Sequence, residues 1–165
     1  MLIYVVRHAI AFPHGTPEYE EDERPLTEQG RNRMCEIVRG LSRLRIKPDR
    51  IVTSPLPRAR QTAEILSGLR DFDGEIEEFG ELAPQGDHRR VVNYLSKSKD
   101  QLRTLALVGH EPNLSELIGF LLTGRPESVV LLKKGAVACL QGEEFESSLQ
   151  YSLQWLLQPR ILRQL

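Results

Sequence analysis

Short apolar runs recur along the chain and predict the strands of a central sheet. LIYVV (residues 2–6) is a continuous apolar run, as expected of a strand that is buried on both faces. RIVT (50–53) and TLALVG (104–109) have the same character, and EIEEF (75–79) is a weaker example. These runs stand far enough apart for a helix to follow each of them, which is the arrangement of a parallel sheet.

Helical periodicity fills the intervals between these runs. Thr27 in PLTEQG is a predicted N-cap. The apolar residues after it recur at three- and four-residue spacing, as on one face of a helix: Met34, Ile37, Val38, Leu41 and Leu44. Further helices are predicted over about 57–69, from a cap at Asp87, and after residue 109, where the inward side chains are Leu114, Leu117, Ile118, Leu121 and Leu122.

The pattern changes after Gly124. SVVLL (128–132), GAVACLQ (135–141) and LQYSLQWLL (149–157) predict strands without intervening helices, which favours an antiparallel extension of the sheet. The tail, residues 158–165, fits either a short helix or an apolar segment packed on the body. The whole pattern predicts one α/β domain over residues 1–165, a three-layer α/β/α sandwich with a mostly parallel central sheet.

Composition gives the molecule no strong overall charge. The net charge is −1, so bulk electrostatics makes no case for nucleic acid or an anionic membrane as a partner, and any basic site must be local. Cys35 and Cys139 have apolar neighbours, which predicts two buried free thiols. The apolar run at the N-terminus is too short for a signal peptide or a membrane span, and we expect a cytoplasmic protein.

Polar residues follow three of the predicted strands. Arg7 and His8 end the first, Ser54 follows the second, and His110 follows TLALVG. Ligands in open α/β sheets bind beyond the carboxyl ends of the strands, so these side chains should share one rim. Any one of these histidines alone is more often structural than catalytic. Two histidines and an arginine at one rim, however, form a cationic pocket that suits phosphate.

Arg58 is a further candidate for this pocket. SPLPRARQTAEIL puts it in the first turn of a helix, where the macrodipole disfavours a cation. An arginine there is easier to explain if it faces an anion that the helix end also attracts. The alternative is that Arg58 or Arg60 points into water, and only one of the two can face the rim.

Four segments in order resemble the landmark segments of the histidine phosphatase superfamily, whose members include the phosphoglycerate mutases: VVRHAIA, RPLTEQG, SPLPRARQTAEIL and LALVGHEPNLSEL. The resemblance covers residues 2 to about 123 and implies a phosphoglycerate mutase-like fold. The short chain, the phrase ELAPQGD and the lack of a long inserted cap are most similar to the small phosphohistidine phosphatases of the SixA type.

The resemblance implies roles for the matching residues. His8 is implied as the nucleophile that becomes phosphorylated, Arg7 and Arg58 as clamps on the phosphate oxygens, and His110 as the group that completes the pocket. No metal and no other cofactor is implied. The family's usual triplet is Arg-His-Gly, whereas Ala9 follows His8 in this chain. An alanine would cost activity if the pocket required a positive φ at this position.

Two further residues have open roles. Ser54 either hydrogen-bonds phosphate, holds Arg58, or caps the turn before Pro55. Family members that act on esters carry a Glu or Asp on the loop after the third strand, and Glu81 is the nearest candidate proton donor. Its alternative is an ordinary surface carboxylate. The acidic run EYEEDER (18–24) is interpreted as a solvated loop at the mouth of the pocket.

These observations favour a metal-independent phosphatase that works through phospho-His8 on phosphohistidine in a protein, such as a signalling phosphotransfer domain. Two alternatives stay open: a phosphatase of small phosphate esters, and a non-catalytic phospho-binding module. The presence of both histidines argues against the module, which would need the arginines alone. The oligomeric state is not predicted.

Overall fold

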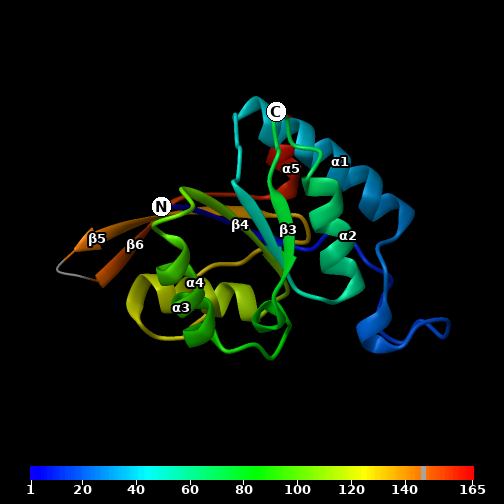
Figure 1. The fold of residues 1–165 in the computed structure, drawn as a ribbon. Helices are drawn as coiled ribbons and strands as arrows, with labels where there is room; N and C mark the ends of the chain where they lie inside the picture. The colour runs from blue at the N-terminus through cyan, green and yellow to red at the C-terminus, as the bar shows by residue number, and fades with distance from the viewer. Residues whose placement is uncertain (146–147) are drawn as a thin grey trace.

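The computed structural model describes residues 1–145 and 148–165. A six-stranded sheet in the order β3-β2-β4-β1-β5-β6 forms the middle layer (Figure 1). The strands are β1 (Leu2–Arg7), β2 (Arg50–Thr53), β3 (Glu75–Glu78), β4 (Thr104–Gly109), β5 (Val137–Phe145) and β6 (Ser148–Leu157). The helices are η1 (Glu21–Glu23), α1 (Glu28–Arg43), α2 (Pro57–Leu66), η2 (Gly80–Leu82), α3 (His88–Ser98), α4 (Asn113–Thr123) and α5 (Pro159–Leu162).

The sheet is mixed in the way that the sequence predicts. β1, β2, β3 and β4 pair in parallel, and β5 and β6 extend the sheet antiparallel beyond β1. In Figure 1, α1, α2 and α5 lie over one face of the sheet, and α3 and α4 lie over the other. The predicted α/β/α sandwich with an antiparallel extension is therefore confirmed.

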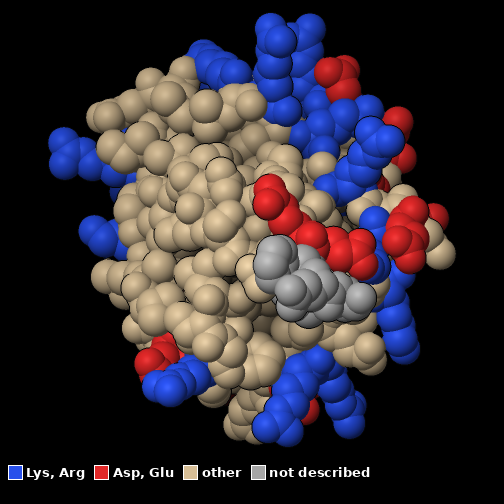
Figure 2. All heavy atoms as spheres, turned by 90° about the vertical axis from the view of Figure 1, so that its left-hand side faces the viewer, with Lys and Arg blue, Asp and Glu red and all other residues tan. Residues whose placement is uncertain are grey.

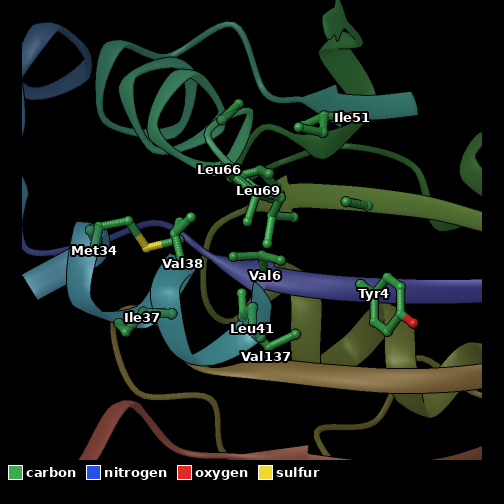
Figure 3. Packing of buried hydrophobic residues seen from close by; sticks show 14 of the residues in the cluster. Tyr4, Val6, Met34, Ile37, Val38, Leu41, Ile51, Leu66, Leu69 and Val137 are labelled. Carbon is green, nitrogen blue, oxygen red and sulfur yellow. The ribbon is translucent and has the colours of Figure 1, made fainter. Parts of the chain in front are cut away.

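The central strand β1 divides its side chains between two hydrophobic cores. Tyr4 and Val6 join the cluster beneath α1 and α2, whereas Ile3 and Val5 join the cluster beneath α3 and α4. This alternation follows from the two-residue period of a strand, and the burial of both faces explains why β1 reads as one unbroken apolar run. Figure 3 shows the first core, in which Met34, Ile37, Val38 and Leu41 of α1 lie against Val6 and Val137.

Several predicted elements have the expected limits. The Thr27 side chain accepts a hydrogen bond from the backbone N–H of Gly30, which caps α1 as predicted. Asp87 caps α3 through the N–H of Arg89. The helix predicted over about 57–69 begins at Pro57 as expected and ends earlier than predicted, at Leu66. The tail satisfies both of its interpretations, because α5 is a short helix whose Leu162 is fully buried against the body.

Two sequence predictions are wrong. Residues 128–132 do not form a strand. Their backbone is bound by side chains instead: the carbonyl of Leu132 accepts from Arg7, its N–H donates to Glu111, and the carbonyl of Leu131 accepts from Gln158. Cys35 is exposed on α1, although Cys139 is buried as expected and both thiols are free. Apolar neighbours in sequence did not reveal that Cys35 faces away from the core.

Charge is distributed unevenly over the surface. Figure 2 views the end of the molecule where β1 begins, and it shows a broad uncharged area with Lys and Arg around its margins, most densely at the top and right. A pocket of about 510 Å³ at the end of α1 is lined by four cations, Arg43, Arg45, Lys47 and Arg70, together with Ser42 and Asp71. The nearly neutral net charge therefore hides local basic regions.

Gly30 marks a close approach that positions the segment after His8. A Cβ at Gly30 would lie 2.0 Å from the backbone oxygen of Ile10, so α1 and this segment could not keep their spacing. We predict that Gly30→Ala lowers the free energy of unfolding by about 1–3 kcal/mol, the usual cost of overpacking a core, in urea denaturation. Gly80→Ala is the matched control, because a Cβ there meets nothing within 4 Å. Equal stabilities of the two variants would contradict this packing.

Candidate functional site

The carboxyl ends of three neighbouring strands meet at one rim. The backbone N–H of His8 donates to the carbonyl of Gly109 at 3.0 Å, and that of Ser54 donates to the carbonyl of Val108 at 2.9 Å. These bonds continue the parallel ladders of β1-β4 and β2-β4 by one residue. The sheet register therefore brings His8, Ser54 and His110 together from positions that are far apart in the sequence.

A pocket of about 270 Å³ opens at this rim. Four of the six predicted site residues line it, namely Arg7, His8, Arg58 and His110. Ser54 is fully buried and contacts His110. The remaining lining residues are His14, Glu21, Asp22, Arg24, Pro84, Glu111 and Lys134.

His8 is held in one orientation at the base of this pocket. Its ring is buried, and Nδ1 lies 2.7 Å from the carbonyl oxygen of Ala9. A carbonyl can only accept, so Nδ1 carries the proton and Nε2 keeps its lone pair. Ala9 is itself fixed, because its N–H donates to Thr62 Oγ1 at 3.0 Å and the Thr62 hydroxyl donates to the carbonyl of Arg58. The backbone after His8 is thus tied to α2.

Alanine fits its position in the Arg7-His8-Ala9 triplet. Among the described residues, the non-glycine residues with positive φ are Arg45 and Asp71. Ala9 therefore has a backbone conformation that any L-residue adopts, and glycine's extra freedom is not needed there.

Burial and nearby positive charges favour the neutral form of both pocket histidines. Burial, the nearby His110 ring, Arg58 and Arg7 together hold the pKa of His8 well below 6.5, against the opposing effect of the Ala9 carbonyl. Burial and the charges of Arg58, Arg7 and Arg24 lower the pKa of His110 to about 3. The ring centroids of the two histidines lie 5.0 Å apart. A neutral His8 is the nucleophilic form at physiological pH.

Arg7 and Arg58 are anchored through backbone carbonyls rather than through carboxylates. Arg7 Nη1 donates to the carbonyl of Leu132 at 2.7 Å, and Arg58 Nη1 donates to those of Glu21 and Asp22 at 3.2 and 3.4 Å. Such bonds orient a guanidinium without neutralising its charge. Arg60 instead pairs with Glu78 at the surface, which decides between the two candidates of α2 in favour of Arg58.

Ser54 holds His110 rather than Arg58. Its Oγ lies 2.8 Å from His110 Nε2 and also accepts from the backbone N–H of Leu56 at 3.3 Å. The hydroxyl proton of this buried serine needs an acceptor, and Nε2 supplies one. His110 then carries its own proton on Nδ1. Within the described part of the chain, His110 Nδ1 and Arg7 Nε are buried without a hydrogen-bond partner, and both are donors suited to an anion.

Glu81 lies outside the pocket. Its carboxylate accepts from Arg90 at 2.9 Å and from the backbone N–H of Asp87 at 2.8 Å, so it stabilises the start of α3. Glu111, which sequence analysis passed over, does line the pocket. Both of its oxygens are occupied as acceptors, one from the N–H of Leu132 and one from the hydroxyl of Ser115.

Arg24 is a third pocket arginine that sequence analysis missed. It is almost fully buried, and it donates to the Phe12 carbonyl and to Glu21. The acidic run 18–24 therefore forms one wall of the pocket through η1, with Glu21 and Asp22 also supplying the carbonyls that hold Arg58. The sequence did offer a clue, because Arg24 ends that run and is also the first residue of the RPLTEQG segment.

Comparisons with known proteins agree with this geometry. The profile of the histidine phosphatase superfamily (branch 1) matches residues 3–83. An uncharacterized protein of Picosynechococcus sp. is 35% identical over 95% of this chain and 99% of its own length. The chain belongs to the histidine phosphatase superfamily. It is accordingly a phosphatase.

Two further likenesses concern SixA. The phosphohistidine phosphatase SixA of Escherichia coli is 24% identical to this histidine phosphatase over 96% of this chain and 94% of that protein. A solved structure of the protein histidine phosphatase SixA complexed with tungstate superposes with a TM-score of 0.85, at 24% identity over 98% and 99% of the two chains. This likeness establishes the fold, which supports many chemistries, and it leaves the substrate open.

The described residues contain neither a membrane-spanning helix nor a metal-binding cluster. No helix among them is long and apolar enough to cross a membrane. In the same part of the chain, no group of three or more His, Cys, Asp or Glu side chains is arranged to hold a metal ion.

The neutral histidines predict how stability depends on pH. The unfolded chain binds protons on these histidines below pH 6.5 while the folded pocket does not, so stability falls as pH drops below 6.5, and for His110 it does so down to its folded pKa of about 3. Each such histidine contributes up to about 1.4 kcal/mol per pH unit in this window. We expect His110→Asn to reduce the pH slope of the free energy of unfolding between pH 6 and 4, as measured by urea denaturation. Parallel slopes for the variant and the wild type would contradict the assignment.

The Ser54 contact predicts the tautomer of His110. The ring ¹⁵N shifts of the wild type should report a proton on Nδ1. In Ser54→Ala we expect the proton to populate both nitrogens, and phosphatase activity to fall about tenfold because a hydrogen bond worth roughly 1.4 kcal/mol is lost. Ser98→Ala is the control, since Ser98 is also buried but bonds the carbonyl of Tyr94 away from the pocket. An unchanged tautomer in Ser54→Ala would overturn the assignment.

Proposed function

We propose that this histidine phosphatase acts without a metal, through a phosphoenzyme on His8, and that it removes phosphate from phosphohistidine in a protein. The observation that carries the proposal is the orientation of His8. Its Nδ1–H is bound to the Ala9 carbonyl, and Nε2 is the nitrogen with a free lone pair in a pocket with three arginines.

The reaction follows from these side chains in two steps. His8 Nε2 attacks the phosphorus in line with the leaving nitrogen, the new N–P bond forms, and the P–N bond of the substrate breaks. Arg7, Arg58 and Arg24 neutralise charge on the phosphoryl oxygens, and the His110 Nδ1–H donates to one of them. Water then attacks phospho-His8, the N–P bond breaks, and inorganic phosphate leaves with His8 restored.

The leaving group supports phosphohistidine over an ester. An imidazole leaves as a neutral base when its other ring nitrogen carries a proton, and that proton can come from solvent. An alkoxide is strongly basic and needs a proton donor beside it. Glu81, the candidate donor, is engaged with Arg90 and with the backbone of Asp87 outside the pocket. Glu111 and Glu21 line the pocket, but their carboxylates are already bound by neighbouring donors.

A phosphatase of small phosphate esters is the second candidate. The observation in its favour is Asp22, a carboxylate that lines the same pocket. If esters were the substrates, Asp22→Asn would reduce ester hydrolysis strongly and spare phosphohistidine. A non-catalytic binding module would retain phosphate and turn over no donor.

Rapid-quench labelling tests the proposed function. A ³²P-phosphohistidine donor should transfer acid-labile phosphate to the wild type and none to His8→Ala, and turnover by the variant should fall by at least about 10³-fold because the nucleophile is missing. His14→Ala is the matched control, since His14 lines the same pocket but is bound to Glu21 at its mouth. Labelling that survives His8→Ala would disprove the role of His8. A panel that compares phosphohistidine with sugar phosphates then assigns the substrate class.

A further inference from the structure

A second hollow adjoins the catalytic pocket. It has a volume of about 190 Å³ and lies between α1, α5 and the turn before β5. We call it the α1/α5 groove. Its cations are Arg33, Lys134, Arg160 and Arg163. Its remaining lining comes mostly from apolar side chains, with Met34 and Ile37 fully buried in its floor.

The groove carries an excess of positive charge. Arg163 pairs with Glu36 of α1. In residues 1–145 and 148–165, no carboxylate lies within salt-bridge distance of Arg33, Lys134 or Arg160. Arg33 and Arg160 are exposed and extend from the first half of α1 and from α5. The groove therefore offers an anionic partner three cations whose charge is not already neutralised.

The groove and the catalytic pocket are continuous at two residues. Lys134 lines both of them, and Ala9, which lines the groove, directly follows His8. Lys134 shares the pocket lining with Arg7, Arg24 and Arg58, and burial together with their charges lowers its pKa. When a substrate places its phosphoryl group beside His8, the part of the substrate that surrounds this group would therefore contact the groove.

The form of the groove fits a protein surface better than a small ester. An apolar floor with a charged, exposed rim is the usual anatomy of a protein interface. The exposed cations of the rim, Arg33 and Arg160, extend from two helices, whereas the phosphoryl group itself would enter the catalytic pocket of about 270 Å³. The lining of that pocket also includes the acidic residues Glu21 and Asp22. The unpaired cations of the groove therefore favour a partner that is acidic beside its phosphoryl group.

We propose that the α1/α5 groove is a docking surface for the acidic face of a phosphorylated protein, and that it selects protein substrates over free phosphohistidine. This proposal rests on the proposed function, because it assumes that the phosphoryl group arrives on a protein. The partner should carry Asp and Glu side chains on one side of its phosphohistidine.

The double substitution Arg33→Glu with Arg160→Glu tests the docking surface. With a ³²P-phosphohistidine phosphotransfer domain of acidic surface as the substrate, we expect kcat/KM to fall at least about tenfold, and its dependence on salt to weaken, because steering and contact charges are reversed. With free phosphohistidine as the substrate, kcat/KM should change less than about twofold, since neither arginine lines the catalytic pocket.

Arg43→Glu with Arg45→Glu is the matched control. This double variant makes the same change in net charge at the other basic hollow. Arg43 follows Arg33 by ten residues on α1, which is about 15 Å along the helix axis. Equal losses in the two double variants, or no loss for the protein substrate in the first, would overturn the docking surface. So would an equal loss on free phosphohistidine, which would indicate a small substrate with a second anionic group. If the wild type hydrolyses neither phosphohistidine substrate, the proposed function fails, and the docking surface fails with it.

Discussion

The site depends on one constraint: His8 must stay neutral and fixed while three arginines crowd around it. The ladder bond from its N–H to Gly109 and the bond from Nδ1 to the Ala9 carbonyl fix its position and its proton. The same burial and the same positive charges that would attract a phosphate also disfavour a proton on Nε2. One arrangement thus supplies both the binding charge and the nucleophile, at the expense of stability in acid.

The anchoring of the arginines follows from this constraint. Carboxylates on Arg7 and Arg58, like the one that Glu21 provides to Arg24, would have reduced the positive charge beside His8 and favoured its protonation. Arg7 and Arg58 are held by backbone carbonyls instead, and the segment before β5 gives up strand structure to provide one of them at Leu132. The segment 128–132, for which the sequence predicted a strand, is thus irregular where it supplies the carbonyl that orients Arg7.

Sequence patterns predicted most of the fold because β1 and β4 are apolar on both faces and the helices carry one apolar stripe each. The parallel ladders then put His8, Ser54 and His110 at one rim, which elementary topology could foresee. Arg24 and Glu81 could not be placed in this way. Both lie in connecting segments, whose course depends on side-chain contacts such as those of Arg24 with Phe12 and of Glu81 with Arg90. The partner of Ser54 was likewise not predicted: the sequence left phosphate, Arg58 and the turn before Pro55 open, whereas the contact is His110, which follows a different strand.

The protonation state of His8 is the most direct test of the account. In ¹⁵N-labelled protein, the ring shifts of His8 should report a neutral imidazole with its proton on Nδ1 throughout pH 8 to 5, because its pKa lies well below 6.5. Addition of orthovanadate, a phosphoryl mimic, should then perturb Nε2 and leave Nδ1 bound to the Ala9 carbonyl. An imidazolium at pH 6, or a proton on Nε2, would contradict the claim that the fold presents His8 as a ready nucleophile.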